Sequence, residues 1–143
     1  MALSRTEREQ FFAEPHIAAL AVDAGEGGGR APLTVPIWYQ YAPGGDVWIM
    51  TGRDSRKAGL IAAAGRFSLM ADRVEPTIRY VSVEGPVVST VAGTREQLTE
   101  MSARYLPPDK VDAYVDFAWQ NHGEQVVIHM RPTHWVSTDL GQV

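Results

Sequence analysis

The sequence predicts an α+β fold built on a mostly antiparallel sheet of about six strands, which could close into a small barrel. Short β-branched and aromatic segments recur along the chain between turn signals. Helical segments stand at the N-terminus, once between strands and as a pair near the C-terminus, so helices and strands do not alternate as in a parallel sheet. The 143 residues contain no repeat and no linker, and we expect a single domain over residues 1–143.

The N-terminal part is predicted to hold one helix followed by three strands. Ser4 and Glu7 form an S-x-x-E capping box, which predicts a short helix through about residue 13. A glycine-rich loop and a Pro-Gly-Gly-Asp turn separate the strands that follow. The third of these strands is apolar on both faces, so we expect both faces to be covered. The predicted strands are 16–23, 31–41 and 47–51, with the loop at 25–29 and the turn at 43–46.

The rest of the chain is predicted to contain three helices and three strands. Gly65 suits the position just past a helix end. Gly85-Pro86 within a long β segment indicates a bulge or an edge strand. Thr94 and Asp109 are the expected N-caps of a helical pair that Pro107-Pro108 separates. In chain order the elements are helix 55–64, strands 66–72 and 77–91, helices 94–105 and 109–119, and strand 125–130.

Composition excludes several classes of function. The formal net charge is −4 and no basic run is present, which argues against a nucleic-acid surface. The absence of cysteine excludes disulfides and thiolate chemistry, and the four histidines have no compact metal-ligand spacing. The N-terminus lacks an apolar signal core, and no apolar stretch is long enough to span a bilayer. We therefore expect a soluble cytoplasmic protein with no metal, nucleic-acid partner or membrane partner.

The most informative segment joins a hydrophobic strand to a helix at residues 51–57. Arg53, Arg56 and Lys57 fall where the helix begins, although a helix N-terminus already carries partial positive charge. Local rules are often broken at functional sites. Free backbone N–H groups, the helix dipole and the cations would together bind a phosphate. The alternative interpretation is a solvated charged turn.

A second irregular segment runs from Val35 to Tyr39 and contains a proline within a predicted strand. Pro36 removes a ladder donor, which implies an edge or an irregular backbone. Trp38 and Tyr39 point to opposite faces, so at least one of the two rings is expected outside the main core. Such a strand could present amides and ring faces to a planar ligand. Ordinary core packing is an equally good interpretation of these residues.

Taken together, these segments resemble the pyridoxamine 5′-phosphate oxidase superfamily of FMN-binding split barrels. The resemblance rests on Met50-Thr51, Ser55-Arg56-Lys57 and Phe67-Ser68-Leu69, followed by the strand 79–85. It covers about residues 11–91 well and the C-terminal strand with Trp135 more loosely. The short chain and its Val-Pro-Ile-Trp and Tyr-Val-Ser-Val-Glu-Gly segments are closer to the actinobacterial flavin/deazaflavin oxidoreductases, many of which use coenzyme F420.

The resemblance implies a six-stranded split barrel with short flanking helices, and a homodimer with two interfacial sites for FMN or coenzyme F420. It places Arg56 and Lys57 on the cofactor phosphate. Tyr80 occupies a contact position where the oxidases usually carry Gln, and Trp135 would approach from the last strand. The arginine and histidine pattern that the oxidases use for pyridoxal phosphate is absent, so we do not expect that activity. The residues implied along the ring or ribityl chain are Val35, Pro36, Trp38, Met50 and Thr51.

The function expected from the resemblance is that of an oxidoreductase that transfers a hydride between coenzyme F420 or FMN and a small organic substrate. In such enzymes the cofactor carries the chemistry and the protein binds and orients it. No side chain stands out as an acid or base, so no catalytic residue is assigned. The alternative is a non-catalytic protein that binds or carries a flavin or another planar ligand, because both would use the same binding residues.

Overall fold

The computed structural model describes residues 1–142, which form four helices and eight strands. The helices are α1 (Arg5–Ala13), α2 (Arg56–Ala64), α3 (Arg95–Tyr105) and α4 (Pro108–Asn121). The strands are β1 (Ala18–Val22), β2 (Leu33–Ile37), β3 (Tyr39–Tyr41), β4 (Val47–Gly52), β5 (Arg66–Arg73), β6 (Ile78–Ala92), β7 (Gln125–Met130) and β8 (His134–Gly141).

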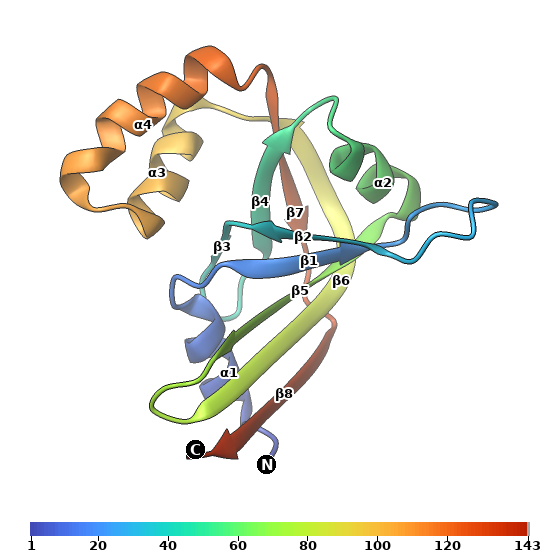
Figure 1. Ribbon diagram of the computed structural model, residues 1–143, viewed down its shortest axis with the longest axis vertical. Coiled ribbons are helices and arrows are strands. Elements are labelled where there is room, and N and C mark those ends of the chain that lie inside the picture. The colour runs from blue at the N-terminus through green and yellow to red at the C-terminus, as the bar shows by residue number, and fades with distance from the viewer. Residues whose placement is uncertain (143) are drawn as a thin grey trace.

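All strand pairs are antiparallel, and the sheet runs in the order β2-β1-β5-β6-β7-β4-β3 (Figure 1). The two ends of this order are joined by the chain itself, because β2 and β3 are consecutive parts of one strand interrupted at Trp38. The first part pairs with β1 and the second with β4. A ring of six strands therefore closes, and the predicted α+β split barrel is confirmed.

One strand was not predicted. β8 follows β7 after three residues and pairs with the first half of β6 (Figure 1). The pattern is weak here, because Pro132 interrupts the segment and β8 mixes polar with apolar residues on a half-exposed strand. The sheet consequently extends beyond the six-stranded ring along the lower part of β6.

The long strand β6 changes partner along one edge, from β8 to β7, at Gly85. A Cβ added to Gly85 would overlap the carbonyl oxygen of Arg131, so only glycine fits here. At the next residue, the carbonyl of Pro86 accepts a hydrogen bond from the Arg131 amide at 3.0 Å. The pairing register between β6 and β7 then shifts between Val87 and Ser89. The sequence indicated a bulge or an edge at Gly85-Pro86. The strand instead changes partner at Gly85, and the irregular register lies further along, between Val87 and Ser89.

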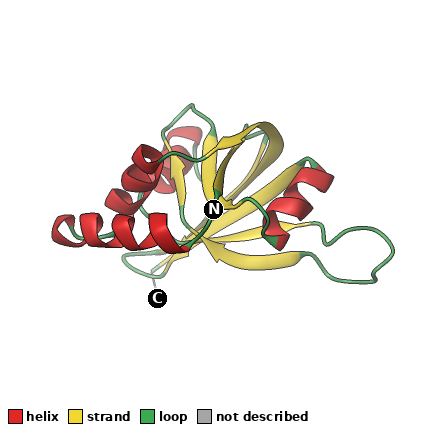
Figure 2. Ribbon diagram, turned by 90° about the horizontal axis from the view of Figure 1, so that it is seen from above, coloured by secondary structure: helices red, strands yellow, loops and turns green. Residues whose placement is uncertain are grey.

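Helix ends follow the predicted capping chemistry with one exception. The Ser4–Glu7 capping box is complete, Thr94 forms a second box with Gln97, and Gly65 ends α2 at φ +73°. Asp109 is not an N-cap as predicted. Instead α4 begins at Pro108, whose missing N–H is unneeded in the first turn. Seen from above, α3 and α4 flank one side of the barrel and the glycine-rich β1–β2 loop projects from the other (Figure 2).

The core fills the barrel and is closed by residues of α1 and α2. Phe12 and Ile61 are buried, and Phe12 stacks on Tyr39 at 4.4 Å between ring centroids. The Tyr39 hydroxyl donates to the Phe12 carbonyl at 2.8 Å, and burial raises the pKa of that phenol. Along β4, Val47 and Ile49 face this core, while the opposite face is half-buried rather than fully covered as we expected.

The lower end of the sheet is fixed by the carboxylate of Asp139 on β8. It accepts hydrogen bonds from the Thr77 hydroxyl at 2.6 Å and from Arg79 Nε at 2.8 Å, and its second oxygen accepts from the Gly141 amide. These hydrogen bonds, led by that of Thr77, hold the pKa of Asp139 at about 2. The main chain of Met1 also pairs with Asp139, which brings the N-terminus beside β8. No helix within residues 1–142 is long and apolar enough to cross a membrane.

We predict that Gly85→Ala destabilises the fold by about 3 kcal/mol or more, because the new methyl group would overlap a backbone oxygen that cannot move without breaking the contact between β6 and the end of β7. Gly59→Ala is the matched control. Gly59 lies inside α2, a Cβ added there would have nothing within 4 Å, and this change should stabilise by about 0.5–1 kcal/mol. Urea unfolding of both variants measures the difference, and equal midpoints would contradict the prediction.

Candidate functional site

The barrel is open between β2 and the end of β4. β3 pairs with β4 only as far as Ile49, and β2 pairs with β1 on its other edge. Within residues 1–142, Met50–Gly52 and Leu33–Ile37 have no strand partner on the edges that face each other. We call this opening the split. Backbone N–H and C=O groups without a ladder partner are strong hydrogen-bonding groups, so the split is suited to hold a polar ligand.

Tyr105 of α3 fixes the point where the two strands diverge. Its hydroxyl accepts from the Tyr39 amide at 3.1 Å and donates to the His16 carbonyl at 2.7 Å. Its ring stacks on Trp38 with centroids 4.7 Å apart and planes 17° apart. The hydroxyl thus replaces the ladder bonds that the main chain gives up at Trp38, and the ring holds the indole on the outside of the barrel.

The upper end of the split is formed by the N-terminus of α2. Ser55 is the N-cap, because its hydroxyl accepts from the Ala58 amide at 3.2 Å and donates to the Gly52 carbonyl at 2.8 Å. Thr51, predicted as a cofactor contact, is only 5 % exposed and its Oγ1 lies 3.4 Å from Ser55 Oγ. Its side chain therefore braces the cap, and only its main chain is available to a ligand.

The three cations of this segment differ in their surroundings. Arg53 forms ion pairs with Glu124 and, at 3.6 Å, with Asp54. Arg56 is exposed and Lys57 is half-buried, and neither forms an ion pair with any residue of 1–142. Two unpaired positive charges therefore remain in the first turn of α2, where the helix dipole adds to their field. Such charges can bind an anion, as predicted, or stay solvated by water, as in the alternative of a solvated charged turn.

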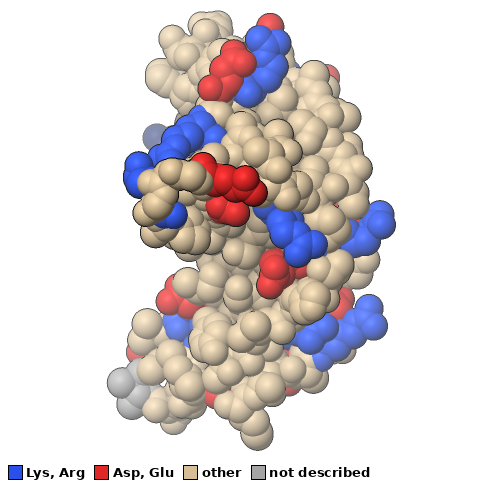
Figure 3. Space-filling model, turned by 90° about the vertical axis from the view of Figure 1, so that its right-hand side faces the viewer, with Lys and Arg blue, Asp and Glu red and all other residues tan. Residues whose placement is uncertain are grey.

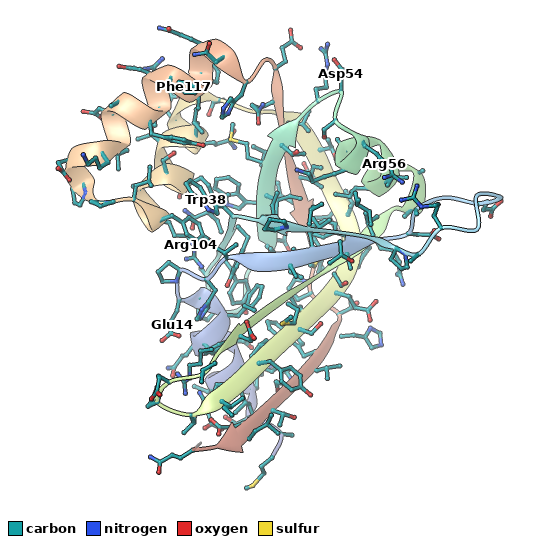
Figure 4. The ribbon with its side chains drawn as sticks, in the orientation of Figure 1. Glu14, Trp38, Asp54, Arg56, Arg104 and Phe117 are labelled. Atoms are coloured by element: carbon teal, nitrogen blue, oxygen red, sulfur yellow. The ribbon has the colours of Figure 1, made fainter. Side chains whose placement is uncertain are left out.

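Below the split, a hollow of about 410 Å³ lies between the barrel and the helical pair. We call it the Trp38 hollow. It brings together predicted residues from β2 and β4 with residues of α4 and β7 that were not predicted. Figure 4 shows Trp38 on the side of β4 that faces α3, and Arg56 beyond the other side at α2. The lining includes Pro36, Trp38, Met50, Tyr114, His122 and Gln125.

Polar groups in this hollow are few. Gln125 Nε2 donates to the His122 carbonyl at 3.0 Å, which joins the end of α4 to the start of β7. Tyr114 is tilted against Trp38 with centroids 5.8 Å apart. Most of the lining is aromatic or aliphatic, as in pockets that bind flat organic rings. Sequence reasoning missed Tyr105, Tyr114 and His122, because nothing local marks which side of a helix will face a barrel.

The remaining predicted residues lie elsewhere in the single chain. Val35 packs against the core, so its side chain points inward from the split. Tyr80 stands near the start of β6, opposite Asp72 and Thr138 on its neighbouring strands. Trp135 packs on Phe12 at 6.0 Å, at the other end of the barrel from α2. One chain therefore brings Pro36, Trp38 and Met50 together in the Trp38 hollow and places Arg56 and Lys57 in the first turn of α2. Tyr80 and Trp135 belong to neither group.

Charge on the face that carries α2 and the glycine-rich loop is divided into small groups. Figure 3 shows Lys and Arg side chains beside Asp and Glu side chains, without a continuous basic surface on that face. Such a surface does not resemble the positive stripe with which proteins follow a nucleic-acid backbone. Among the described residues, no group of three or more His, Asp or Glu side chains is placed to hold a metal ion.

Comparison with known proteins finds similarity in structure alone. No family model and no curated protein matches the sequence. A conserved hypothetical protein of Mycobacterium tuberculosis is similar in structure, with a TM-score of 0.72 and 24 % identity over 97 % of this chain and 86 % of that chain. An F420 reductase gives a TM-score of 0.69 and 21 % identity over 90 % of this chain and 94 % of that chain.

A FAD-binding protein from Mycobacterium smegmatis gives a TM-score of 0.61 and 17 % identity, over 98 % of this chain and 99 % of that chain. The likeness to all three proteins extends over at least 90 % of this chain. At these identities it establishes a shared fold, and function has to be argued from the site.

We predict that Tyr105→Phe lowers the free energy of unfolding by about 1–2 kcal/mol, because the Tyr39 amide and the His16 carbonyl lose their shared partner. Tyr114→Phe is the control, since Tyr114 also lies against Trp38 but its hydroxyl forms no hydrogen bond with residues 1–142. Urea denaturation followed by circular dichroism compares the two variants. A Tyr105→Phe protein as stable as Tyr114→Phe would show that this hydroxyl does not secure the split.

Proposed function

We propose that the split binds coenzyme F420 or FMN and that the protein uses it to transfer a hydride to or from a small organic substrate. The observation that carries the proposal is the pair of unpaired cations, Arg56 and Lys57, at a capped helix N-terminus beside open strand edges. The F420 reductase and the FAD-binding protein that share the fold support a cofactor of this class.

The phosphate of the cofactor is assigned to the first turn of α2. The Ser55 hydroxyl caps the helix at the Ala58 amide, so the other amides at the start of α2 and the two cations remain for an anion. Arginine can bind two phosphate oxygens through its planar fork, while lysine adds a point charge. Each such charge-assisted hydrogen bond is worth about 1.5–3 kcal/mol.

The tricyclic ring is assigned to the lower part of the split, against Trp38 and Met50. Both the deazaflavin and FMN carry their phosphate on a ribityl chain, so one molecule could reach from α2 to the Trp38 hollow. Bound there, the cofactor supplies the hydride chemistry. The chain's own residues would orient the ring, with Pro36 and Trp38 on the β2 side, and exclude water through the aromatic and aliphatic lining.

We further propose that the working unit is a homodimer. α1 and α2 both place residues in the core, so neither covers the outer face of β1, β5, β6 and β8. On that face, Ala19 lies opposite Met70 and Ala21 opposite Ser68, and Val136 is 60 % exposed. A second copy seated on this face would cover it, and it would place Tyr80 of one chain at the interface, as the resemblance implies.

Titration of the purified protein with coenzyme F420 and with FMN tests the cofactor assignment. We expect Lys57→Ala to weaken binding at least about tenfold, and Arg56→Ala with Lys57→Ala together about a hundredfold or more, because each removes a charge-assisted contact to phosphate. Lys110→Ala, which removes an exposed charge on α4, should leave affinity unchanged. The dissociation constants are measured by absorbance or fluorescence of the cofactor.

Two outcomes would count against the proposal. Failure of the wild-type protein to bind either cofactor would refute it, and unchanged affinity in the double variant would remove the phosphate assignment. A cofactor that binds but exchanges no hydride with any reductant or acceptor would favour the carrier over the enzyme. Preference for one cofactor in the same titration decides between the deazaflavin and FMN.

Light scattering coupled to gel filtration tests the homodimer. We expect the wild-type protein to have twice the mass of one chain. Ala19→Arg should raise the dissociation constant of the dimer at least about a hundredfold, because it buries an unpaired charge at the interface. Ala103→Arg, on the exposed surface of α3, is the control and should stay dimeric. A monomeric wild-type protein, or an Ala19→Arg variant as dimeric as the control, would refute this arrangement.

A further inference from the structure

A second hollow, of about 340 Å³ and lined mostly by polar residues, lies at the opposite end of β4 from α2. It is bounded by α1, by the turn that joins β3 to β4 and by the link that joins β7 to β8 (Figure 1). Its lining contains three arginines, two carboxylates and the rings of Tyr41 and Trp135. We call it the Arg8 hollow, and its charged and indole residues are Arg5, Arg8, Glu9, Asp46, Arg131 and Trp135.

Four of the five charges in this hollow are paired. Arg5 Nε lies 2.8 Å from a Glu9 oxygen, and Arg131 Nε lies 3.7 Å from an Asp46 oxygen. The hydrogen bond from Arg5 lowers the pKa of Glu9, which therefore stays ionised near neutral pH. Arg8 forms neither an ion pair nor a side-chain hydrogen bond with any described residue, and its buried Nε has no partner.

The position of Arg8 is nevertheless fixed by its neighbours. Its guanidinium carbon lies 5.0 Å from the centre of the Trp135 ring, a cation–π contact. Trp135 is held in turn by edge-on contacts with Phe12 at 6.0 Å and Tyr41 at 5.9 Å. A partly buried guanidinium held in place without an anion is energetically unfavourable, because the loss of water is not offset by a hydrogen-bonding partner.

We propose that the Arg8 hollow binds a small aromatic monocarboxylate, with Arg8 as the carboxylate ligand. The guanidinium fork matches the two oxygens of a carboxylate. Three cations and two anions line the hollow, so one negative charge restores neutrality, whereas a phosphate dianion would face an excess of negative charge beside Glu9 and Asp46. Tyr41 and Trp135 also line the hollow, so an aromatic body held there would meet aromatic side chains.

The size and place of the hollow agree with this ligand. Its volume is near the lower end for small-molecule sites, which suits a single-ring acid rather than a tricyclic cofactor with its side chain. It shares no lining residue with the Trp38 hollow. The proposal therefore does not depend on cofactor binding at the split, and the two can fail separately.

Calorimetric titration with benzoate at constant ionic strength tests the proposal. We expect saturable binding of benzoate, with benzamide, its neutral counterpart, and inorganic phosphate each at least about tenfold weaker. Arg8→Gln should weaken benzoate binding at least about tenfold. Arg66→Gln is the control, because it removes one exposed arginine from the other end of the barrel and should bind like the wild type.

Several results would overturn the inference. The first is a wild-type protein that does not bind benzoate, and the second is a wild-type protein that binds benzamide as tightly as benzoate. The third is an Arg8→Gln protein that binds benzoate as tightly as the Arg66→Gln control. Circular dichroism establishes that each variant is folded. If Arg8→Gln does not fold, Arg8→Lys replaces it, since lysine keeps the charge but lacks the fork, and unchanged affinity in that variant also overturns the proposal.

Discussion

The site depends on one strand that changes partner. Residues 33–41 leave β1 and join β4 at Trp38, and both ladders together close the barrel. At the change the main chain loses regular ladder bonds, and Tyr105 supplies a hydroxyl to the Tyr39 amide in their place. A ladder continued on both edges would seal β2 against β4. The split exists because a side chain from another element satisfies the backbone at this one position.

The same opening explains the unusual charges at the start of α2. Arg56 and Lys57 stand where the helix dipole is already positive, and no described carboxylate neutralises them, whereas Arg53 is paired with Glu124. A purely structural turn gains nothing from this arrangement. An anion-binding turn does gain, because Ser55 caps the helix through its side chain and leaves other amides free. The unfavourable placement of two cations beside the positive end of the helix dipole is explained if a ligand supplies the missing negative charge.

Features set by neighbouring residues were predictable from the sequence, and features set by distant ones were not. The capping box of Ser4 and Glu7 and the left-handed Gly65 both follow from local chemistry. The six strands of the ring follow from their apolar patterns. β8 was not predicted, because a half-exposed strand after Pro132 has only a weak alternation of polar and apolar residues. The roles of Tyr105 and Tyr114 were not predicted, because only tertiary packing decides that their helices face Trp38.

Trp135 shows why family resemblance and packing have to be considered together. The resemblance assigns this indole to a cofactor, yet within one chain it lies against Phe12 and supports Arg8, far along the barrel from α2. A homodimer can reconcile the two roles only if the second copy brings its split to the β8 end of the first. A monomer would instead leave Trp135 with its packing role alone, so the oligomeric state decides whether this indole also contacts a cofactor.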